Sequence, residues 1–471
     1  MGTIEQKLQY LLGTKQAIRQ AIEAKGVEVT DEDTFRSYAG KINLINTGQM
    51  ISPKNVNFYD YDGSLIYAYT TEEALALTEM PPLPTQIGLI CQEWNYTFEE
   101  MMFMTQDCGN CDIGATYITD NGETRLYMEI TSLQKEVSIL IYQTISEDVV
   151  VDWGDGSEQS TVEGTGNKTF AHNYVNEGNY IIRIDSTLGT YSFASPSSSG
   201  GSQYANFLGN SNNSLKKVEY GARTTSMIAN NVFNKCFSLE TITIPRNFTT
   251  IGSSGTSYAL DMVPSLRALI LPRSVTTIQT NAIYRCQGMT VLSIPPGVVS
   301  LQMALYYTPL KRLVVPHTIT TLSIASGNNN AHILEEIIIP PSAPVTTPSI
   351  SGCTSIRSLT MPKKAVQITA NNQCGYNLNC EKFIFLGDVT KIGASSGSYA
   401  TFIQSYGAKL YDFRNCSAVP TLASSGQFPV ISSSKGKIVV PDELYDAWVT
   451  ATNWSAYASY IVKSSDFADY D

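Results

Sequence analysis

The stretch Leu239-Glu-Thr-Ile-Thr-Ile-Pro245 decides the fold of this chain, because its pattern recurs along the C-terminal half. The pattern is an apolar residue, two variable residues, an apolar residue, one variable residue, another apolar residue and a proline. It returns at 266–272, 289–295, 310–316, 334–340 and 356–362, with the prolines 21 to 27 residues apart. Each unit of such a repeat exposes an apolar face that only the next unit can cover. The pattern therefore predicts a solenoid with a continuous core of Leu, Ile and Val.

Weaker copies of the pattern extend the series in both directions, to about ten turns in all. They lie at 215–220, 383–386, 411–413 and 438–441. A second apolar element between the cores, at 248–251, 275–278 and 319–322, predicts a second short strand in each turn. The proline ends each core strand where no further ladder donor is needed. We therefore expect the solenoid to span residues 205–441.

Two segments that precede repeat cores carry a further signature. Asn231-Val-Phe-Asn-Lys-Cys236 and Asn281-Ala-Ile-Tyr-Arg-Cys286 each end in a cysteine and predict a short helix or a turn. With the cores, they resemble the BspA-like, Treponema-type leucine-rich repeats, whose consensus has phenylalanine and cysteine before a Leu-Ile-Pro core. Beyond the last copy, 442–471 with Trp448 and Trp454 predicts a helix and an aromatic cap, which a solenoid needs over its open end.

Residues 126–194 predict a small β unit. The strand Val137–Ile141 is followed by a second strand that runs into Trp153-Gly-Asp-Gly156, then by Phe170-Ala-His-Asn-Tyr174 and by a strand that begins Gly178-Asn-Tyr180. This order resembles the immunoglobulin-like β-sandwich domain of the polycystic-kidney-disease (PKD) type, which occurs in extracellular proteins. The resemblance implies a β-sandwich over 126–194.

The N-terminal residues 1–45 predict a helical hairpin. Apolar side chains at Ile4, Leu8, Leu11, Ile18 and Ile22 form a heptad seam, and Gly26 is a normal end for that helix. Phe35, Tyr38 and Ile42 give a second helix its apolar face. Two interpretations stay open: a helix of a small hairpin, or a segment that oligomerises or anchors the protein.

Residues 46–125 alternate apolar and polar residues as strands do, and Asp62-Gly63 is a hairpin turn signal. Thr71–Leu75 predicts a short helix, and the prolines after Met80 end it. The fold class predicted for the whole chain is mainly β and multidomain. It comprises a helical hairpin, a small β module, a PKD-like sandwich and a C-terminal leucine-rich-repeat solenoid.

Composition excludes several functions. The net charge of −11 opposes binding to nucleic acid or to anionic membranes. No apolar run reaches the length of a membrane-spanning helix, and the N-terminus lacks the apolar core of a signal peptide. Charged residues make up only 15% of the chain, so Ser, Thr, Asn, Gln and Tyr must build the polar surface. That mixture suits extended β architecture outside the cell better than a cytosolic enzyme.

Chemistry-bearing residues form no recognisable site. The three histidines, His172, His317 and His332, allow no nucleophile–base–acid set, and His172 belongs to the sandwich motif. Cys108-Gly-Asn-Cys111 has the spacing of a redox or half-zinc motif, but no second pair completes it. The nine cysteines are scattered and odd in number, so we expect reduced, buried thiols.

The acidic residues lead to the same expectation. Asp60, Asp62, Asp152 and Asp155 could ligate calcium, but turn roles explain them better. Paired carboxylates for glycoside hydrolysis stay open, because 42 acidic residues always offer pairs. We expect no enzymatic activity, no metal and no cofactor.

Several motifs together resemble the tail-fibre-like proteins of gut phages, including those that infect Bacteroidales. The matching stretches are Gly13–Ile18, Lys25–Val27, Phe35–Tyr38, Phe58–Gly63, Leu77–Pro81, Gln92–Tyr96, Ile438–Asp442 and Asn453-Trp454. The resemblance implies a virion component that attaches to other tail proteins through its N-terminus and meets the host surface with its repeats. Fibres of this kind are usually homotrimers.

The partner expected for the repeats is a host glycan or protein. Tyrosines at 258, 284, 306, 307 and 376 could stack on sugars, although packing is the commoner role in a repeat body. Two alternatives stay open: a bacterial cell-surface adhesin of the same repeat class, and a glycan-degrading enzyme.

Overall fold

The computed structural model describes part of the chain, namely residues 14–15, 18–19, 29, 38, 53–195, 207–225, 227–229, 231–252, 258–304, 308–325, 333–369, 374, 377, 379–393, 408–424 and 436–467. The chain divides into two compact units, Met1–Pro53 and Lys54–Asp471. In the first unit, Val29 and Tyr38 are buried against Ile18. The predicted helical hairpin of 1–45 otherwise lies outside the described residues.

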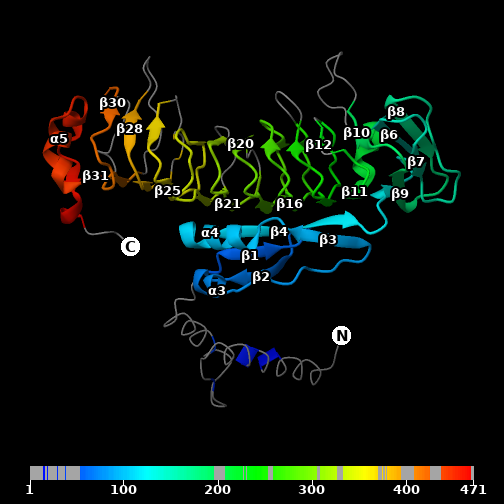
Figure 1. Ribbon diagram of the computed structural model, residues 1–471, viewed down its shortest axis with the longest axis horizontal. Coiled ribbons are helices and arrows are strands. Elements are labelled where there is room, and N and C mark those ends of the chain that lie inside the picture. The colour runs from blue at the N-terminus through cyan, green and yellow to red at the C-terminus, as the bar shows by residue number, and fades with distance from the viewer. Residues whose placement is uncertain are drawn as a thin grey trace, which may run out of the picture. The chain divides into compact units, whose positions relative to one another are not determined.

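The second unit is mainly β, and its C-terminal part is the predicted solenoid (Figure 1). The repeat core supplies one strand per turn, and these strands lie side by side. They are β11 (Leu215–Glu219), β13 (Thr241–Thr243), β16 (Ala268–Ile270), β19 (Val291–Ser293), β21 (Arg312–Val314), β23 (Glu336–Ile338), β25 (Ser358–Met361), β27 (Lys382–Phe385), β29 (Leu410–Asp412) and β31 (Lys437–Val440). Where neighbours pair they are parallel, as in Leu269 opposite Leu292. We call the outward side chains of these ten strands the strand face.

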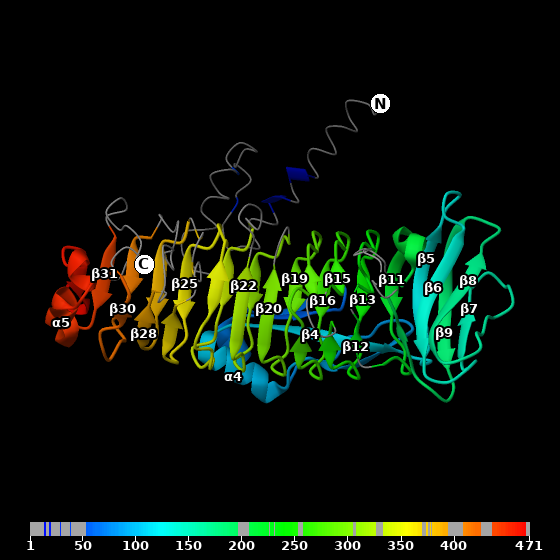
Figure 2. The ribbon, with the colours of Figure 1, turned by 90° about the horizontal axis from the view of Figure 1, so that it is seen from above.

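A second set of short strands runs along another side of the solenoid (Figure 2). The strands predicted at 248–251, 275–278 and 319–322 are present as β14, β17 and β22. The set comprises β12 (Met227–Ile228), β14 (Thr250–Ile251), β15 (Leu260–Asp261), β17 (Thr277–Ile278), β18 (Ile283–Tyr284), β20 (Ser300–Ala304), β22 (Thr321–Ala325), β24 (Ser349–Ser351), β26 (Val366–Ile368), β28 (Val389–Ile392) and β30 (Thr421–Leu422). Each turn combines its core strand with one or two of these short strands, and together they enclose one apolar core.

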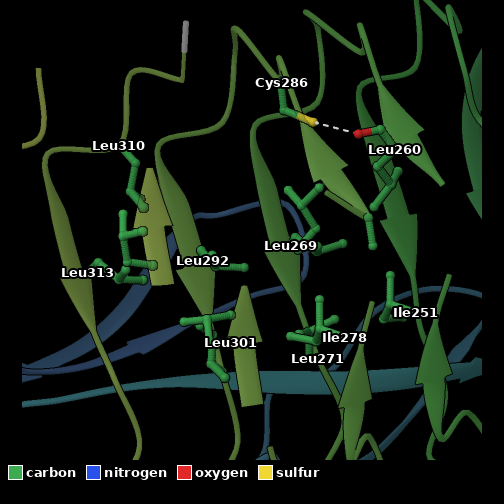
Figure 3. Packing of buried hydrophobic residues seen from close by; sticks show 14 of the residues in the cluster. Ile251, Leu260, Leu269, Leu271, Ile278, Cys286, Leu292, Leu301, Leu310 and Leu313 are labelled. Atoms are coloured by element: carbon green, nitrogen blue, oxygen red, sulfur yellow. Dashed lines mark hydrogen bonds between the residues drawn. The ribbon is translucent and has the colours of Figure 1, made fainter. Parts of the chain in front are cut away.

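The core repeats with the sequence. Leu269, Leu292 and Leu313 occupy equivalent inward positions and are buried (Figure 3). Cys286 lies in the same core, and its thiol is 3.6 Å from the Leu260 carbonyl oxygen. Burial raises the pKa of Cys286 to about 12, so it stays a neutral thiol and packs as a small apolar side chain.

The β unit at the N-terminal end of the solenoid has two sheets. One sheet has the order β10-β6-β8, and the other has the order β13-β11-β5-β9-β7. The strands of this unit are β5 (Thr124–Ile130), β6 (Glu136–Gln143), β7 (Val149–Asp152), β8 (Gly166–Asn173), β9 (Gly178–Ser186) and β10 (Tyr191–Phe193), and a 3-10 turn, η1 (Gly209–Ser214), precedes β11. Strand β5 pairs antiparallel with both β9 and β11, so the first repeat strand continues a sheet of this unit. That pairing covers one open end of the solenoid.

The C-terminal end is covered by η4 (Asp442–Leu444), α5 (Tyr445–Thr450), η5 (Trp454–Tyr457), β32 (Ile461–Lys463) and η6 (Ser464–Asp466). Trp448 and Trp454 are fully buried, with ring centroids 4.6 Å apart. The Trp454 indole N–H donates to the Pro420 carbonyl at 2.7 Å. Strand β32 pairs with β31 and adds a last strand to the sheet.

Residues 54–119, which we call the N-terminal module, form a sheet with two helices. The sheet order is β2-β1-β4-β3. The elements are β1 (Val56–Tyr59), β2 (Leu65–Tyr69), α3 (Thr71–Leu75), β3 (Leu89–Trp94), α4 (Phe98–Cys108) and β4 (Cys111–Thr119). Helix α3 lies at the predicted position. Helix α4 was not predicted, although Thr97 and Glu100 form a capping box at its start.

Asp148 fastens the turn between β9 and β10. Its carboxylate accepts hydrogen bonds from the Ser186 and Thr187 hydroxyls and from the backbone N–H groups of Thr187, Leu188 and Gly189. These hydrogen bonds, that of Ser186 foremost, hold the pKa of Asp148 well below its usual range.

We expect the Asp148→Asn variant to lose about 1–3 kcal/mol of unfolding free energy at neutral pH, because several donors lose a charged acceptor. A carboxyl whose folded pKa is lowered stabilises the protein above its unfolded pKa of about 4, and the effect disappears as the pH falls. Urea unfolding should therefore show the gap between the variant and the wild type closing below about pH 4. A gap that is constant with pH would contradict this role.

Candidate binding surface

The strand face is covered over its first turns and open later. In a strand, alternate side chains point to opposite faces, so Ala268 and Ile270 point away from the core that contains Leu269. Both are nevertheless buried, as are Ser293 and Val314 at the equivalent outward positions. The N-terminal module lies along this part of the solenoid (Figure 1). Its own apolar core includes Val314 of the solenoid.

The module approaches closely because it presents small residues. A Cβ atom on Gly114 of β4 would lie 2.3 Å from a methyl carbon of Ile270. A Cβ on Gly63, at the β1–β2 turn, would lie 3.0 Å from that of Ala268. Gly63 also has a φ of +88°, a conformation that glycine adopts readily. The sheet of the module therefore packs directly on the strand face.

Buried hydrogen bonds join the two sheets. The Asn95 side-chain amide donates to the Leu271 carbonyl and to the Ser293 hydroxyl, each at 2.8 Å, and accepts from the Gly114 N–H at 2.7 Å. The Ser293 hydroxyl donates to the Asp112 carbonyl at 2.6 Å, and the Tyr96 hydroxyl donates to the Ile294 carbonyl at 2.7 Å. Buried polar groups need such partners, so these contacts fix the module in one position.

Arg312 supplies the charged contact. Its guanidinium donates to the Asp112 carboxylate at 3.0 Å, to the Asn110 side-chain oxygen at 2.8 Å and to the Asn55 carbonyl at 2.9 Å. Asn57 donates to the same carboxylate at 3.1 Å. Burial raises the pKa of Asp112, and Arg312 and Asn57 oppose that rise. Asp112 thus depends on Arg312 to remain an anion inside the interface.

A cleft of about 560 Å³ opens where the module ends. Asp107 and Cys108, the last residues of α4, form one wall. The floor and the opposite wall come from β23 and β25, with Glu335, Glu336, Ile337, Ile338, Ile339, Pro341, Arg357, Ser358 and Thr360. These two strands belong to different sheets. The cleft therefore lies over an interruption of strand pairing at the first uncovered turns.

Two charged side chains at the cleft remain accessible. Glu336 and Arg357 are 57% and 70% exposed. Glu335 pairs with Lys311 at 3.2 Å, and Glu336 lies 3.7 Å from Arg312. Ion pairs this exposed contribute little to stability. These charged side chains can therefore bind a ligand with little loss of folding stability.

The histidines have structural partners. His172 Nε2 lies 2.7 Å from an Asp155 carboxylate oxygen, and its ring stacks on Trp153 at 5.0 Å. Tyr174 donates to the Trp153 carbonyl at 2.7 Å, so the Trp-Gly-Asp-Gly turn is tied to β8. His317 packs on Phe103 of α4 at 4.6 Å, and burial lowers its pKa. His332 lies outside the described residues.

The aspartates that could have ligated calcium accept hydrogen bonds within turns instead. Asp62, Asp152 and Asp155 each accept from a backbone N–H two residues later, at 2.8 to 3.0 Å. Asp60 accepts from the Tyr61 N–H at 2.8 Å and from the Gln86 amide at 2.6 Å. Among the described residues, no three His, Cys, Asp or Glu side chains are grouped to hold a metal ion.

The Cys108–Cys111 pair joins α4 to β4. Both are free thiols, and Cys111 is buried. Burial raises the pKa of Cys108 to about 11 and that of Cys111 well above its ordinary value. Redox and zinc chemistry need the thiolate, which this environment disfavours.

All nine cysteines are free, and only Cys91 and Cys108 are half-buried. We expect a thiol reagent to label those two slowly in the native protein and all nine after denaturation, because the neutral buried thiol is unreactive. Mass spectrometry of the labelled protein would locate the sites. Rapid native labelling of Cys236 or Cys286 would contradict the packing described.

The tyrosines proposed for sugar stacking are engaged or undescribed. The Tyr258 and Tyr284 rings lie 5.5 Å apart, edge to face. The Arg285 guanidinium covers Tyr284 at 4.8 Å and pairs with Asp261 at 2.6 Å. Tyr306, Tyr307 and Tyr376 lie outside the described residues. The ring face of Tyr284 is thus already partly used for packing.

Comparison with known proteins identifies the repeats. The family description "BspA type Leucine rich repeat region" matches six copies across residues 207–333. This part of the solenoid is therefore similar to BspA-type leucine-rich repeats. A leucine-rich repeat protein of solved structure from Bacteroides ovatus ATCC 8483 is similar at 14% identity over 62% of this chain and 90% of that one, with a TM-score of 0.27. No curated protein matches.

In the part of the chain that the structure describes, no helix has the length and apolar character needed to cross a membrane.

Proposed function

We propose that this protein is a non-enzymatic surface-recognition protein that binds its target through the uncovered part of the strand face. The observation that carries the proposal is the contrast between two halves of one surface. Ala268 is sealed by the N-terminal module, whereas Glu336 and Ser358 at the equivalent position are exposed beside a cleft. Ile270 and Val314 are sealed as well, whereas Ile338 and Thr360 at their equivalent position are only half-buried. Solenoids bind partners on such extended surfaces.

In its finer form, the proposal is a phage virion component, a tail fibre or receptor-binding subunit. Residues 1–45 attach it to other tail proteins, a homotrimer is the working assembly, and residues 205–441 meet a host glycan or protein. The motif resemblance at Phe58–Gly63 and Gln92–Tyr96 supports this placement. The net charge of −11 argues against a nucleic-acid partner, and the protein is proposed not to insert into a membrane.

Residues 126–194 are proposed to be a PKD-like sandwich. The stacking of His172 on Trp153 and the Tyr174 hydrogen bond give its motif residues a shared role in one turn. This unit then acts as a spacer and as the end cover of the solenoid.

A bacterial cell-surface adhesin is the second candidate, and the BspA-type repeats favour it. An antibody against the full chain separates the two. Detection in purified phage particles, with the antibody blocking adsorption to host cells, supports the tail-fibre proposal. Detection on bacterial envelopes and not on particles supports the adhesin. An antibody that blocks neither adsorption nor adhesion overturns surface recognition altogether.

A further inference from the structure

The open strand face beyond the module carries two parallel rows of side chains. Glu336 and Ser358 are exposed at one outward position of β23 and β25, and Ile338 and Thr360 are half-buried at the next. Ile338 packs in part against the apolar core of the module and also lines the cleft. The register continues the rows onto β27, because Ser358 lies beside Lys382 and Thr360 beside Ile384. Hydrogen-bonded strands such as β25 and β27 lie about 4.8 Å apart. A polar row therefore runs beside a largely aliphatic row across successive turns.

The cleft offers hydrogen-bond acceptors and donors side by side. Glu335, Glu336 and Asp107 accept, whereas Arg357 donates, and the hydroxyls of Ser358 and Thr360 do both. A sugar hydroxyl also donates and accepts, so it can bridge a carboxylate and a guanidinium. Pyranose rings add an aliphatic C–H face that suits Ile338. The length of one pyranose unit is similar to the spacing of the strands.

The charges favour a neutral ligand. Glu335 and Glu336 each have a cationic neighbour, Lys311 and Arg312, and Asp107 already accepts from the Ser342 N–H at 3.0 Å and the Ser342 hydroxyl at 2.7 Å. Arg357 also pairs with a carboxylate, that of Glu381 at 3.6 Å, so a polyanion would gain no unpaired cation here. A purely apolar ligand would leave these groups without partners.

We infer that this cleft, with the rows over β25 and β27, binds a short stretch of a neutral polysaccharide. The inference rests on the proposed function and names the ligand class of its surface. The sugar units lie across the strands, with their hydroxyls toward Glu336, Ser358 and Arg357 and a C–H face over Ile338. The end of α4 limits the chain on one side.

The test measures binding of the full-length protein to immobilised neutral oligosaccharides of glucose, mannose and galactose. Sulfated oligosaccharides, amino-sugar oligosaccharides and extended peptides form separate arms. Glu336→Gln and Arg357→Gln should each weaken binding of the neutral sugars about tenfold, because each removes a charged hydrogen-bond partner. Ser358→Trp should abolish binding by filling the cleft. Glu158→Gln, at an exposed acid in the β unit, is the matched control and should bind normally.

Each outcome decides the inference. Neutral-sugar binding that the three cleft variants weaken, and the control does not, supports it. Binding confined to peptides or to charged sugars, binding indifferent to the variants, or no binding at all overturns it. The antibody experiment tests surface recognition independently of sugar binding. If the antibody blocks adsorption while neutral sugars fail to bind, the inferred ligand class is wrong and the proposed surface recognition stands. Thermal melts check that all variants fold. We expect them to fold, because the substituted side chains are exposed.

Discussion

The Gly114→Val variant is expected to lose the packing of the N-terminal module on the solenoid. Its Cβ would lie 2.3, 2.7 and 3.0 Å from the three outer carbons of the Ile270 side chain, well inside van der Waals contact. Ile270 is 3% exposed and lies between two sheets, so it has little room to move. Overpacking of this kind costs about 1–3 kcal/mol and occasionally more, and the two methyls of valine place this case at the upper end. Urea unfolding and hydrogen exchange over residues 54–119 would measure the loss.

Ile270→Ala provides the matched control. Alone it should cost about 2–5 kcal/mol, because it leaves a cavity at the interface. Combined with Gly114→Ala it should cost less than the sum of the two single changes, since the added methyl occupies vacated space. Residues in contact show coupling of about 0.5–3 kcal/mol in such cycles. Strict additivity, or a Gly114→Val protein as stable as the wild type, would show that the module does not pack here as described.

The repeats could be predicted from the sequence because the physical constraint itself repeats. Each turn needs inward residues such as Leu269 and Leu292, and the proline after each core strand fixes the spacing. The aromatic cap followed from the same logic, and Trp448 and Trp454 are fully buried in it. Mainly β architecture and the solenoid are confirmed.

The covering of the strand face could not be predicted in this way. Ala268, Ile270 and Ser293 stand at variable positions of the repeat, and a period says nothing of what lies over an outward side chain. Ile270 was the available signal, because an aliphatic residue at an outward position needs a partner. Finding that partner requires the module's position, which depends on contacts such as Asn95 to Ser293 between residues far apart in the chain.

The cleft was missed for a related reason. One of its walls is the end of α4, a helix in a region read as β structure. The capping box of Thr97 and Glu100 was the overlooked signal. The boundary predicted between residues 125 and 126 falls inside β5, because that strand completes a sheet with β11. The local alternation of apolar and polar residues predicts a strand near β5 but does not show that this strand also pairs with β11.

The Arg312→Met variant should lose about 3–5 kcal/mol, because it leaves the Asp112 carboxylate buried without its cation. The Arg312 and Asp112 side chains are 21% and 11% exposed, so water can replace little of the lost interaction. The Asn110 and Asn55 oxygens lose their donor at the same time. Arg312→Lys keeps the charge but cannot reach three acceptors in one plane, so an intermediate loss is expected. Denaturant unfolding of the three proteins measures the series.

We expect the unpaired Asp112 carboxylate, more than the lost hydrogen bonds of Arg312, to cause the loss of stability in Arg312→Met. Arg312→Met combined with Asp112→Asn should therefore be more stable than Arg312→Met alone, since the amide needs no cation. Burial already raises the pKa of Asp112, and loss of Arg312 removes a force that opposes the rise. A raised carboxyl pKa means that protonation favours the folded state, so the deficit of Arg312→Met should shrink as the pH falls from about 7 toward 5. If the loss of unfolding free energy in Arg312→Met stays constant over this pH range and Asp112→Asn does not relieve it, the loss comes from packing. The ion pair between Arg312 and Asp112 would then contribute nothing to the stability of the interface.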